Sequence, residues 1–261
     1  MASSIGIDTA EDYRVLNEAI SISKTYKSLT GLTWPGESGS ELERLDEAVC
    51  GNITITDTLV SSQRTARASV LHLVSLFEQG VEPRATIAVA LSRAALVSAG
   101  RIIYVLGPDD PENRQTNAQK IVARQLGSHL SATRATTSFQ ELAYLKAPDD
   151  LVEYLQETKS AIPGGEVGDG WMIKETSQIM ANLLVSRGLA KEDTVQLSEH
   201  LEWMWHVWSG MAHGWAWPKY FPGGDSDDRD IAPGHWVTDF RTLTSTVQLA
   251  LQLLNDGLRA A

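Results

Sequence analysis

The sequence predicts an all-α protein, a multi-helix bundle of about seven to nine helices with no substantial sheet. Apolar residues recur at helical spacing along most of the 261 residues, and no segment alternates apolar with polar residues for long enough to form a strand. Prolines and glycines bracket the periodic segments, where helices start and stop. We therefore expect a single helical domain over 1–261, with 1–62 as a candidate N-terminal helical extension of a core bundle over 63–261.

The composition excludes several classes of protein. Hydrophobic residues make up 43% of the chain and charged residues 21%, which is typical of a soluble globular protein and excludes a disordered one. The formal charge of −11 excludes a nucleic-acid binder that works by bulk positive charge. Cys50 is the only cysteine, so no disulfide-forming compartment is implied. Because 1–12 also lacks the pattern of a signal peptide, we expect a cytoplasmic protein.

The most apolar segment, 85–107, is long enough to span a bilayer. It contains Arg93 and Arg101, each of which would cost about 2.5–3.5 kcal/mol near the centre of a membrane. We therefore predict a helix buried in the protein core, with its guanidinium groups paired or at the edge, and no contact with a membrane.

The N-terminal part of the chain contains clear helix boundaries. A helix is predicted over 10–27, before the turn-rich segment 31–36. Ser40 and Glu43 have the spacing of a capping box, in which Ser40 accepts from the N–H of Glu43 and Glu43 accepts from the N–H of Ser40. The β-branched residues of 52–56 weaken the helical pattern locally.

The remaining elements follow from the same signals. A helix over 63–79 ends at Gly80, and the next begins at Pro83. The glycine-rich segment 163–170 is the best candidate for a subdomain boundary, and it lacks the Lys-Ser/Thr ending of a phosphate-binding loop. The other predicted helices cover 83–105, 110–132, 138–158 (with a break risk at 147–148), 175–187, 194–213 and 236–260.

Tryptophan is concentrated near the end of the chain, where six of the eight fall between 203 and 236. Such a concentration indicates either a packed core or a walled pocket. Helical spacing predicts one core stripe, made of Leu197, Leu201, Met204, Trp208 and Met211. The candidate groove for a partner helix or apolar ligand is lined by Trp205, Trp208, Trp215 and Trp217.

A polar stripe lies opposite this core stripe. Its members fall within about 60° of one another around the helix axis: Glu202, His206, Ser209 and His213. One interpretation is an acid–base relay in which Glu202 orients His206 and His213 lies near Ser209. The alternatives are the solvated side of an amphipathic helix, and an imidazole of His213 that interacts with the last carbonyls of the helix.

A metal site is not predicted. His206 and His213 lie seven positions apart, whereas two ligands on one helix usually lie three or four apart. The acidic run 225–230 lacks the layout of a calcium loop.

Arg93 has two interpretations. If its side chain faces the polar stripe, it gives the site a fixed positive charge suited to binding phosphate or carboxylate. The alternative is that Arg93 forms a structural ion pair with an Asp or Glu side chain.

The segment Ser209-Gly210-Met211-Ala212-His213-Gly214 resembles a family of uncharacterised helical proteins common in actinobacteria, in which a late helix ends in Ser-x-x-x-His-Gly. Their earlier, alanine-rich helix is similar to Ser92-Arg93-Ala94-Ala95-Leu96, and it ends at a turn like 107–110. The resemblance covers 64–260. Such proteins look remotely like HEPN domains and abortive-infection proteins, which are all-α dimers, and some of these cleave RNA without a metal ion.

The resemblance departs from the nuclease signature of those proteins, which places an Arg ahead of the His. The helix that ends at His213 has no Arg at that spacing. Arg124 and His129 match the signature formally, but about one such match is expected by chance in a chain of this composition.

Three functions follow as hypotheses. The first, implied by the resemblance, is a HEPN-like defence or stress-response protein, a metal-independent ribonuclease or a degenerate relative, acting as a homodimer. His213 would be the general base or acid, with Ser209 and His206 in support and Arg93 holding phosphate. RNA would meet a basic stripe of Arg114, Lys120, Arg124 and Arg134. The second is a non-enzymatic module that binds a protein partner, and the third is a hydrolase that uses Ser209. None requires a cofactor.

Overall fold

The structure is a computed structural model that describes residues 7, 9–29, 36–49, 53–137, 139, 148–214 and 235–260. Over these residues the protein is all-α and has no strand, which confirms the predicted fold class. In chain order the elements are α1 (Ala10–Lys24), the 3-10 helix η1 (Thr25–Lys27), α2 (Glu41–Glu47), α3 (Ile55–Glu78), α4 (Ala85–Leu106), α5 (Pro111–Thr137), α6 (Asp149–Ala161), α7 (Asp169–Ser186), α8 (Lys191–Ala212) and α9 (His235–Gly257).

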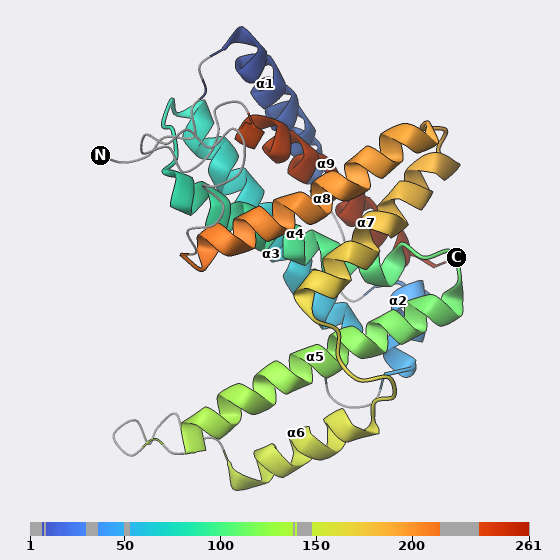
Figure 1. The fold of residues 1–261 in the computed structure, drawn as a ribbon. Coiled ribbons are helices and arrows are strands. Elements are labelled where there is room, and N and C mark those ends of the chain that lie inside the picture. The colour runs from blue at the N-terminus through green and yellow to red at the C-terminus, as the bar shows by residue number, and fades with distance from the viewer. Residues whose placement is uncertain are drawn as a thin grey trace.

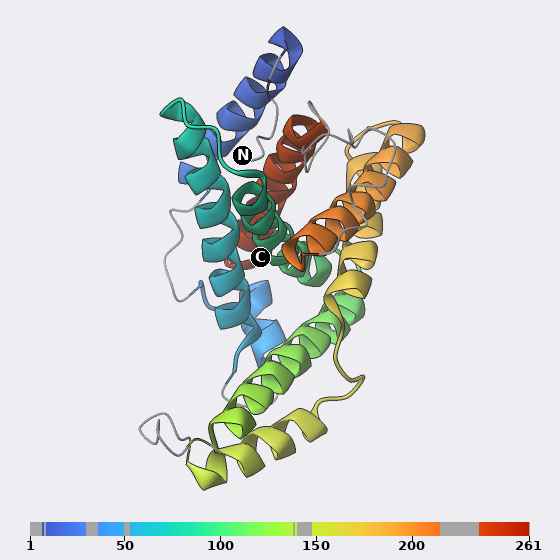
Figure 2. The same cartoon turned by 60° about the vertical axis from the view of Figure 1, so that its left-hand side comes forward.

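Helix α4 is the centre of the bundle. It packs against α3, α5, α7, α8 and α9, and Figures 1 and 2 show these helices surrounding it. Helix α4 is also the one helix of the described residues that is long and apolar enough to cross a membrane. However, 72% of its most apolar window is buried inside the bundle, as in the core helix of a soluble protein.

Helices α5 and α6 form an arm. In both views α6 and the second half of α5 extend away from the remaining helices (Figures 1 and 2). Within the arm, α6 packs along α5, and Leu126, Leu130 and Leu155 are buried there. At the opposite side of the bundle α1 packs against α9, and the hydroxyl of Tyr26 donates to the backbone oxygen of Thr244 at 2.7 Å.

Three of the described helices begin three or more residues earlier than the sequence predicts, and one of them is α8, which starts at Lys191 instead of at 194. Helix α3 starts at Ile55 because the side chain of Thr54 accepts from the N–H of Asp57, at 3.0 Å, and caps the helix. It runs without a break through 62–63, where the expected N-terminal extension meets the expected core. Helix α7 starts at Asp169, inside the expected glycine-rich loop, because burial of Met172 and Ile173 stabilises an additional turn.

The predicted capping box is half formed. The hydroxyl of Ser40 accepts from the N–H of Glu43 at 3.3 Å, but the carboxylate of Glu43 accepts from the N–H of Gly39 rather than from that of Ser40. The predicted break at 147–148 is followed by α6, which starts at Asp149. Residues 138 and 140–147, expected to be helical, lie outside the described residues, as does Cys50.

Candidate functional site

Arg93 and Ser209 join the two helices that the sequence singled out. Nε of Arg93, on α4, donates to Oγ of Ser209, on α8, at 3.0 Å, and both side chains are partly buried. A guanidinium group has five N–H donors, and this bond uses one. Within the described part of the chain, no carboxylate forms an ion pair with Arg93. The arginine therefore faces the polar stripe and has donors available for a ligand.

The polar stripe is divided between two environments. Glu202 is partly buried and accepts from the hydroxyl of Ser177 on α7 at 3.4 Å, whereas His206 and His213 are exposed. No hydrogen bond between Glu202 and His206 is present, so the structure does not form the expected relay between the described side chains. The stripe lies at the boundary of the core, with its Glu202 and Ser209 edge facing other helices.

His213 is at the end of α8. It is the C-cap residue, and its backbone N–H donates to the carbonyl of Ser209 at 3.1 Å. The exposed imidazole makes no hydrogen bond with any residue that the structure describes. His213 therefore lies one helical turn beyond Ser209 and is accessible to a large substrate.

The core stripe of α8 is confirmed. Leu201, Met204 and Trp208 are buried, and Leu197 and Met211 pack against the same core. Because Trp208 is 1% exposed, it cannot line an open groove, although the sequence placed it in one. Trp215 and Trp217, the other expected groove residues toward the end of the chain, lie outside the described residues.

The expected groove residue Trp205 packs against a neighbouring helix. Its ring lies on Gly170 in the first turn of α7, and one edge of the ring contacts the imidazole of His206, with the two ring centroids 4.8 Å apart. The indole N–H is buried and has no partner among the described residues. Trp205 therefore serves helix packing on the face that the structure describes.

A His–Asp pair was missed by sequence reasoning. Nε2 of His200, on α8, lies 2.6 Å from Oδ1 of Asp239, on α9. Both line an open cavity of about 550 Å³ together with Trp203, which is 41% exposed. Spacing within one helix could not reveal the pair, because its two members lie on different helices, which residues 213–234 separate in the chain.

A second arginine of α4 lines a cavity of its own. Arg101 and Arg124 face a cavity of about 320 Å³ that is otherwise lined mainly by hydroxyl-bearing and amide side chains. The N-terminus of α7, which has no side-chain cap, borders the same cavity. Asp169 lies 3.8 Å from Arg101, which is the structural ion pair that the sequence left open for this arginine. The helix N-terminus favours an anion there, but Asp169 and Glu166 already offset the charges of the two arginines.

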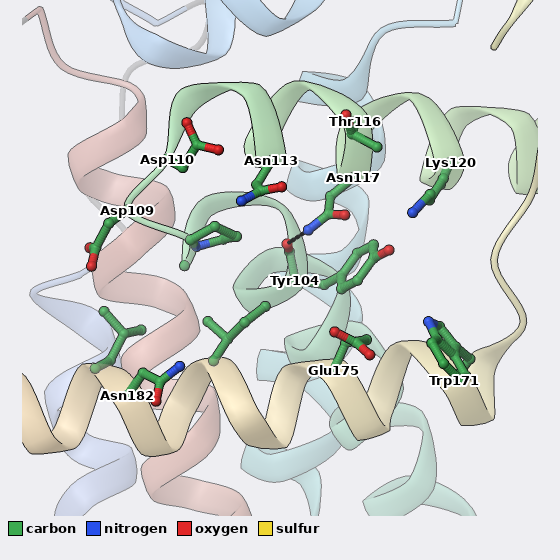
Figure 3. A pocket seen from close by; sticks show the side chains of 14 residues that line it. Tyr104, Asp109, Asp110, Asn113, Thr116, Asn117, Lys120, Trp171, Glu175 and Asn182 are labelled. Atoms are coloured by element: carbon green, nitrogen blue, oxygen red, sulfur yellow. Dashed lines mark hydrogen bonds between the residues drawn. The ribbon is translucent and has the colours of Figure 1, made fainter. Parts of the chain in front are cut away.

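Two of the four cations in the expected basic stripe are paired with carboxylates. Arg114 pairs with Glu41 at 3.3 Å and Arg124 lies 3.8 Å from Glu166, whereas Arg134 donates to the neutral amide of Gln156. Lys120 instead lines a polar cavity of about 560 Å³ between α4, α5 and α7 (Figure 3). That cavity was also missed, because its polar residues on α5 have the spacing of an ordinary solvated helix face.

Among the described residues, no group of three or more His, Cys, Asp or Glu side chains is placed to hold a metal ion. No protein-family model, curated protein or solved structure matches the chain.

Proposed function

We propose that the protein is a HEPN-like helical protein that cleaves RNA without a metal ion, at the corner formed by Arg93, Ser209 and His213. The observation that carries this proposal is the hydrogen bond between Arg93 and Ser209. It holds a guanidinium group at the edge of the core, one helical turn from an exposed imidazole. Guanidinium and imidazole groups are together suited to bind a phosphodiester and to move a proton beside it.

The proposed roles follow from the exposure and chemistry of the three side chains. His213 accepts the proton of a ribose 2′-hydroxyl, and the 2′-oxygen attacks the adjacent phosphorus. The bond from phosphorus to the 5′-oxygen breaks, and the 5′-oxygen takes a proton from water. The hydroxide left behind takes the proton that His213 had accepted, which regenerates water and the neutral imidazole. The products are a 2′,3′-cyclic phosphate and a 5′-hydroxyl. Arg93 stabilises the negative charge that develops on the phosphate oxygens, and Ser209 orients Arg93.

Glu202 and His206 have lesser roles in this proposal. Glu202 hydrogen-bonds Ser177, so it stabilises the contact between α7 and α8 rather than orienting an imidazole. His206 lies two helical turns before His213, about 10 Å along the axis, which is too far to act on the same phosphate. It is exposed on the same side of α8 and contacts a neighbouring nucleotide.

The charge of the protein sets the conditions for RNA binding. With a formal net charge of −11, the protein repels a polyanion such as RNA, and only clusters of basic side chains can oppose that repulsion locally. Arg101 and Arg124 are paired with Asp169 and Glu166, so the cation that opposes the repulsion at the proposed site is Arg93. We further propose, from the resemblance to HEPN proteins, that the protein is a cytoplasmic homodimer with a defence or stress-response role.

The test is RNA cleavage by the purified protein in EDTA at low salt, with structured and unstructured RNA. We expect His213→Ala to lower the rate at least about 100-fold, because it removes the general base. Arg93→Gln is expected to lower it similarly, and Ser209→Ala less. The matched control is His129→Ala, which removes another exposed imidazole, on α5, and should leave the rate unchanged. No cleavage by the wild type, or cleavage that survives His213→Ala, would contradict the proposal.

A non-enzymatic interaction module is the second candidate. The observation that favours it is Trp203, exposed beside the His200–Asp239 pair in an open cavity. Exposed tryptophans in such cavities are frequent anchors for partner proteins. Trp203→Ala should leave RNA cleavage unchanged, so a loss of cleavage in this variant would connect the two surfaces.

A further inference from the structure

A polar cavity beside the C-terminal end of α4 has no part in the proposed RNA cleavage. It has a volume of about 560 Å³ and lies between the C-terminal end of α4, the first half of α5 and α7 (Figure 3). Side chains of α5 and α7 face each other across it, and Tyr104 of α4 forms its floor. A cavity of this size accommodates a small organic molecule.

Tyr104 is the first indication that the cavity has a ligand. The residue is 2% exposed, and Figure 3 shows its hydroxyl directed into the cavity. Within the described part of the chain that hydroxyl makes no hydrogen bond, and its oxygen is open to the cavity, since it is not one of the fully buried unpaired polar atoms. Burial and the negative charge of nearby Glu175 raise the pKa of Tyr104 to about 12, so the hydroxyl stays protonated. The partner of this hydroxyl must therefore lie in the cavity, where a ligand can replace the water that otherwise pairs with it.

The charges of the lining are predominantly negative. Glu175, on α7, faces the cavity near Tyr104, and Asp109 lies toward the other end, beside Asn182 (Figure 3). Glu175 and Asn182 are seven residues apart, which places them about 10 Å apart along the helix. Neither carboxylate forms an ion pair with a described residue, and Lys120 comes within 4 Å of no carboxylate there.

Two further groups define the walls. Asn117 donates through Nδ2 to the backbone oxygen of Tyr104 at 2.7 Å, which fixes α5 against α4 (Figure 3). Asp110 accepts from the N–H of Glu112 at 3.3 Å, so its charge is partly offset by the N-terminus of α5. The amide oxygens of Asn113 and Asn182 are additional acceptors in the lining.

We propose that this cavity binds a small organic molecule with two or more ammonium groups, of which a linear polyamine is the simplest. An ammonium group donates up to three hydrogen bonds, which Glu175, the hydroxyl of Tyr104 and an amide oxygen accept at one end. A second ammonium group reaches Asp109 at the other end. The lining disfavours an anion, because it contains three carboxylates and one lysine. It also disfavours an apolar ligand, which would leave the polar side chains of the lining without partners.

The test is calorimetric titration of the full-length protein with spermidine at about 0.1 M salt, which screens charges more than about 10 Å apart. We expect one site per chain. Glu175→Gln should weaken binding at least about tenfold, because it removes a charge-assisted hydrogen bond, and Tyr104→Phe should weaken it a few-fold. The matched control is Glu153→Gln on the exposed face of α6, which changes the net charge equally and should leave the affinity within about twofold.

Three outcomes would overturn the proposal. One is equal weakening by Glu175→Gln and Glu153→Gln, which would show attraction to the overall charge. The second is unchanged binding in folded Glu175→Gln and Tyr104→Phe variants, with folding verified by circular dichroism. The third is binding of inorganic phosphate or of the neutral disaccharide trehalose that Tyr104→Phe abolishes, which would assign the cavity to another class of ligand. None of these outcomes depends on RNA cleavage, so this proposal and the proposed function fail separately.

Discussion

The indole of Trp205 lies directly against Gly170, so closely that a β-carbon on Gly170 would be 2.7 Å from Cη2 of the ring. Replacing a helical glycine by alanine usually stabilises a protein by about 1 kcal/mol. Here we expect the opposite sign, because Gly170→Ala must displace a large ring between α7 and α8. The free energy of unfolding, measured with urea, should fall by about 1–3 kcal/mol.

The control for this contact is a second substitution. Trp205→Leu removes the rigid ring, so Gly170→Ala in the Trp205→Leu background should recover most of the stability lost in the wild-type background. An equal loss in both backgrounds would show that the effect does not come from the ring.

Tyr26→Phe should destabilise the contact between η1 and α9. The hydroxyl of Tyr26 is buried and donates to the carbonyl of Thr244 at 2.7 Å. Removing the hydroxyl should lower the free energy of unfolding by about 1 kcal/mol, which is the usual net contribution of one hydrogen bond. Urea unfolding measures this change, with the exposed Tyr13→Phe as a matched control that should be neutral. Equal effects of the two substitutions would contradict the structural role.

Stability should fall in alkaline solution because of two buried phenols. Burial raises the pKa of Tyr26 above its usual value and, together with Glu175, raises that of Tyr104 to about 12. In the unfolded chain both phenols ionise near pH 10. The stability that the two protonated phenols contribute is therefore complete below about pH 10. For Tyr104 it is lost between about pH 10 and 12, and for Tyr26 the loss continues to higher pH.

Urea unfolding across this pH range tests the assignment. The Tyr26→Phe, Tyr104→Phe double variant should show a shallower loss of stability between about pH 10 and 12 than the wild type. An identical slope in both proteins would show that other groups cause the loss.

Ser92→Ala should be neutral or stabilising. Ser92 is fully buried in α4, and its hydroxyl has no hydrogen-bond partner among the described residues. Removing an unpaired buried hydroxyl relieves a desolvation cost, so we expect the melting temperature to stay the same or rise by a few degrees. The matched control is Thr176→Val, also on a buried helix face, which should destabilise because the Thr176 hydroxyl donates to the carbonyl of Gly100 at 3.1 Å. A marked loss on Ser92→Ala would point to a partner outside the described residues.

The helices were predictable because their signals are local. The capping residue Ser40, the turn at Gly107-Pro108 and the proline at the start of α5 each act within a few residues of the helix end that they set. The start of α7 at Asp169 was wrong because burial there outweighs weak local propensity, whereas the start of α3 was wrong because the local cap at Thr54 was not recognised among the β-branched residues.

The residues of the candidate site could be predicted from the sequence, but the contacts that they make with other helices could not. Helical periodicity places Ser209 and His213 on one face of α8, but it cannot say which neighbouring helix each residue of that face meets. Glu202 therefore proved to contact Ser177, although the spacing equally allowed a contact with His206.

The sequence by itself determined the all-α class, most helix ends and the core stripe of α8, because each depends on hydrogen bonds and periodicity within one segment. Only the tertiary structure decided that Arg93 meets Ser209, 116 residues away, and that Tyr104 and Glu175 face one cavity. The physical reason is that the packing of a helix is set by the combined shape of all its neighbours, which no single segment contains.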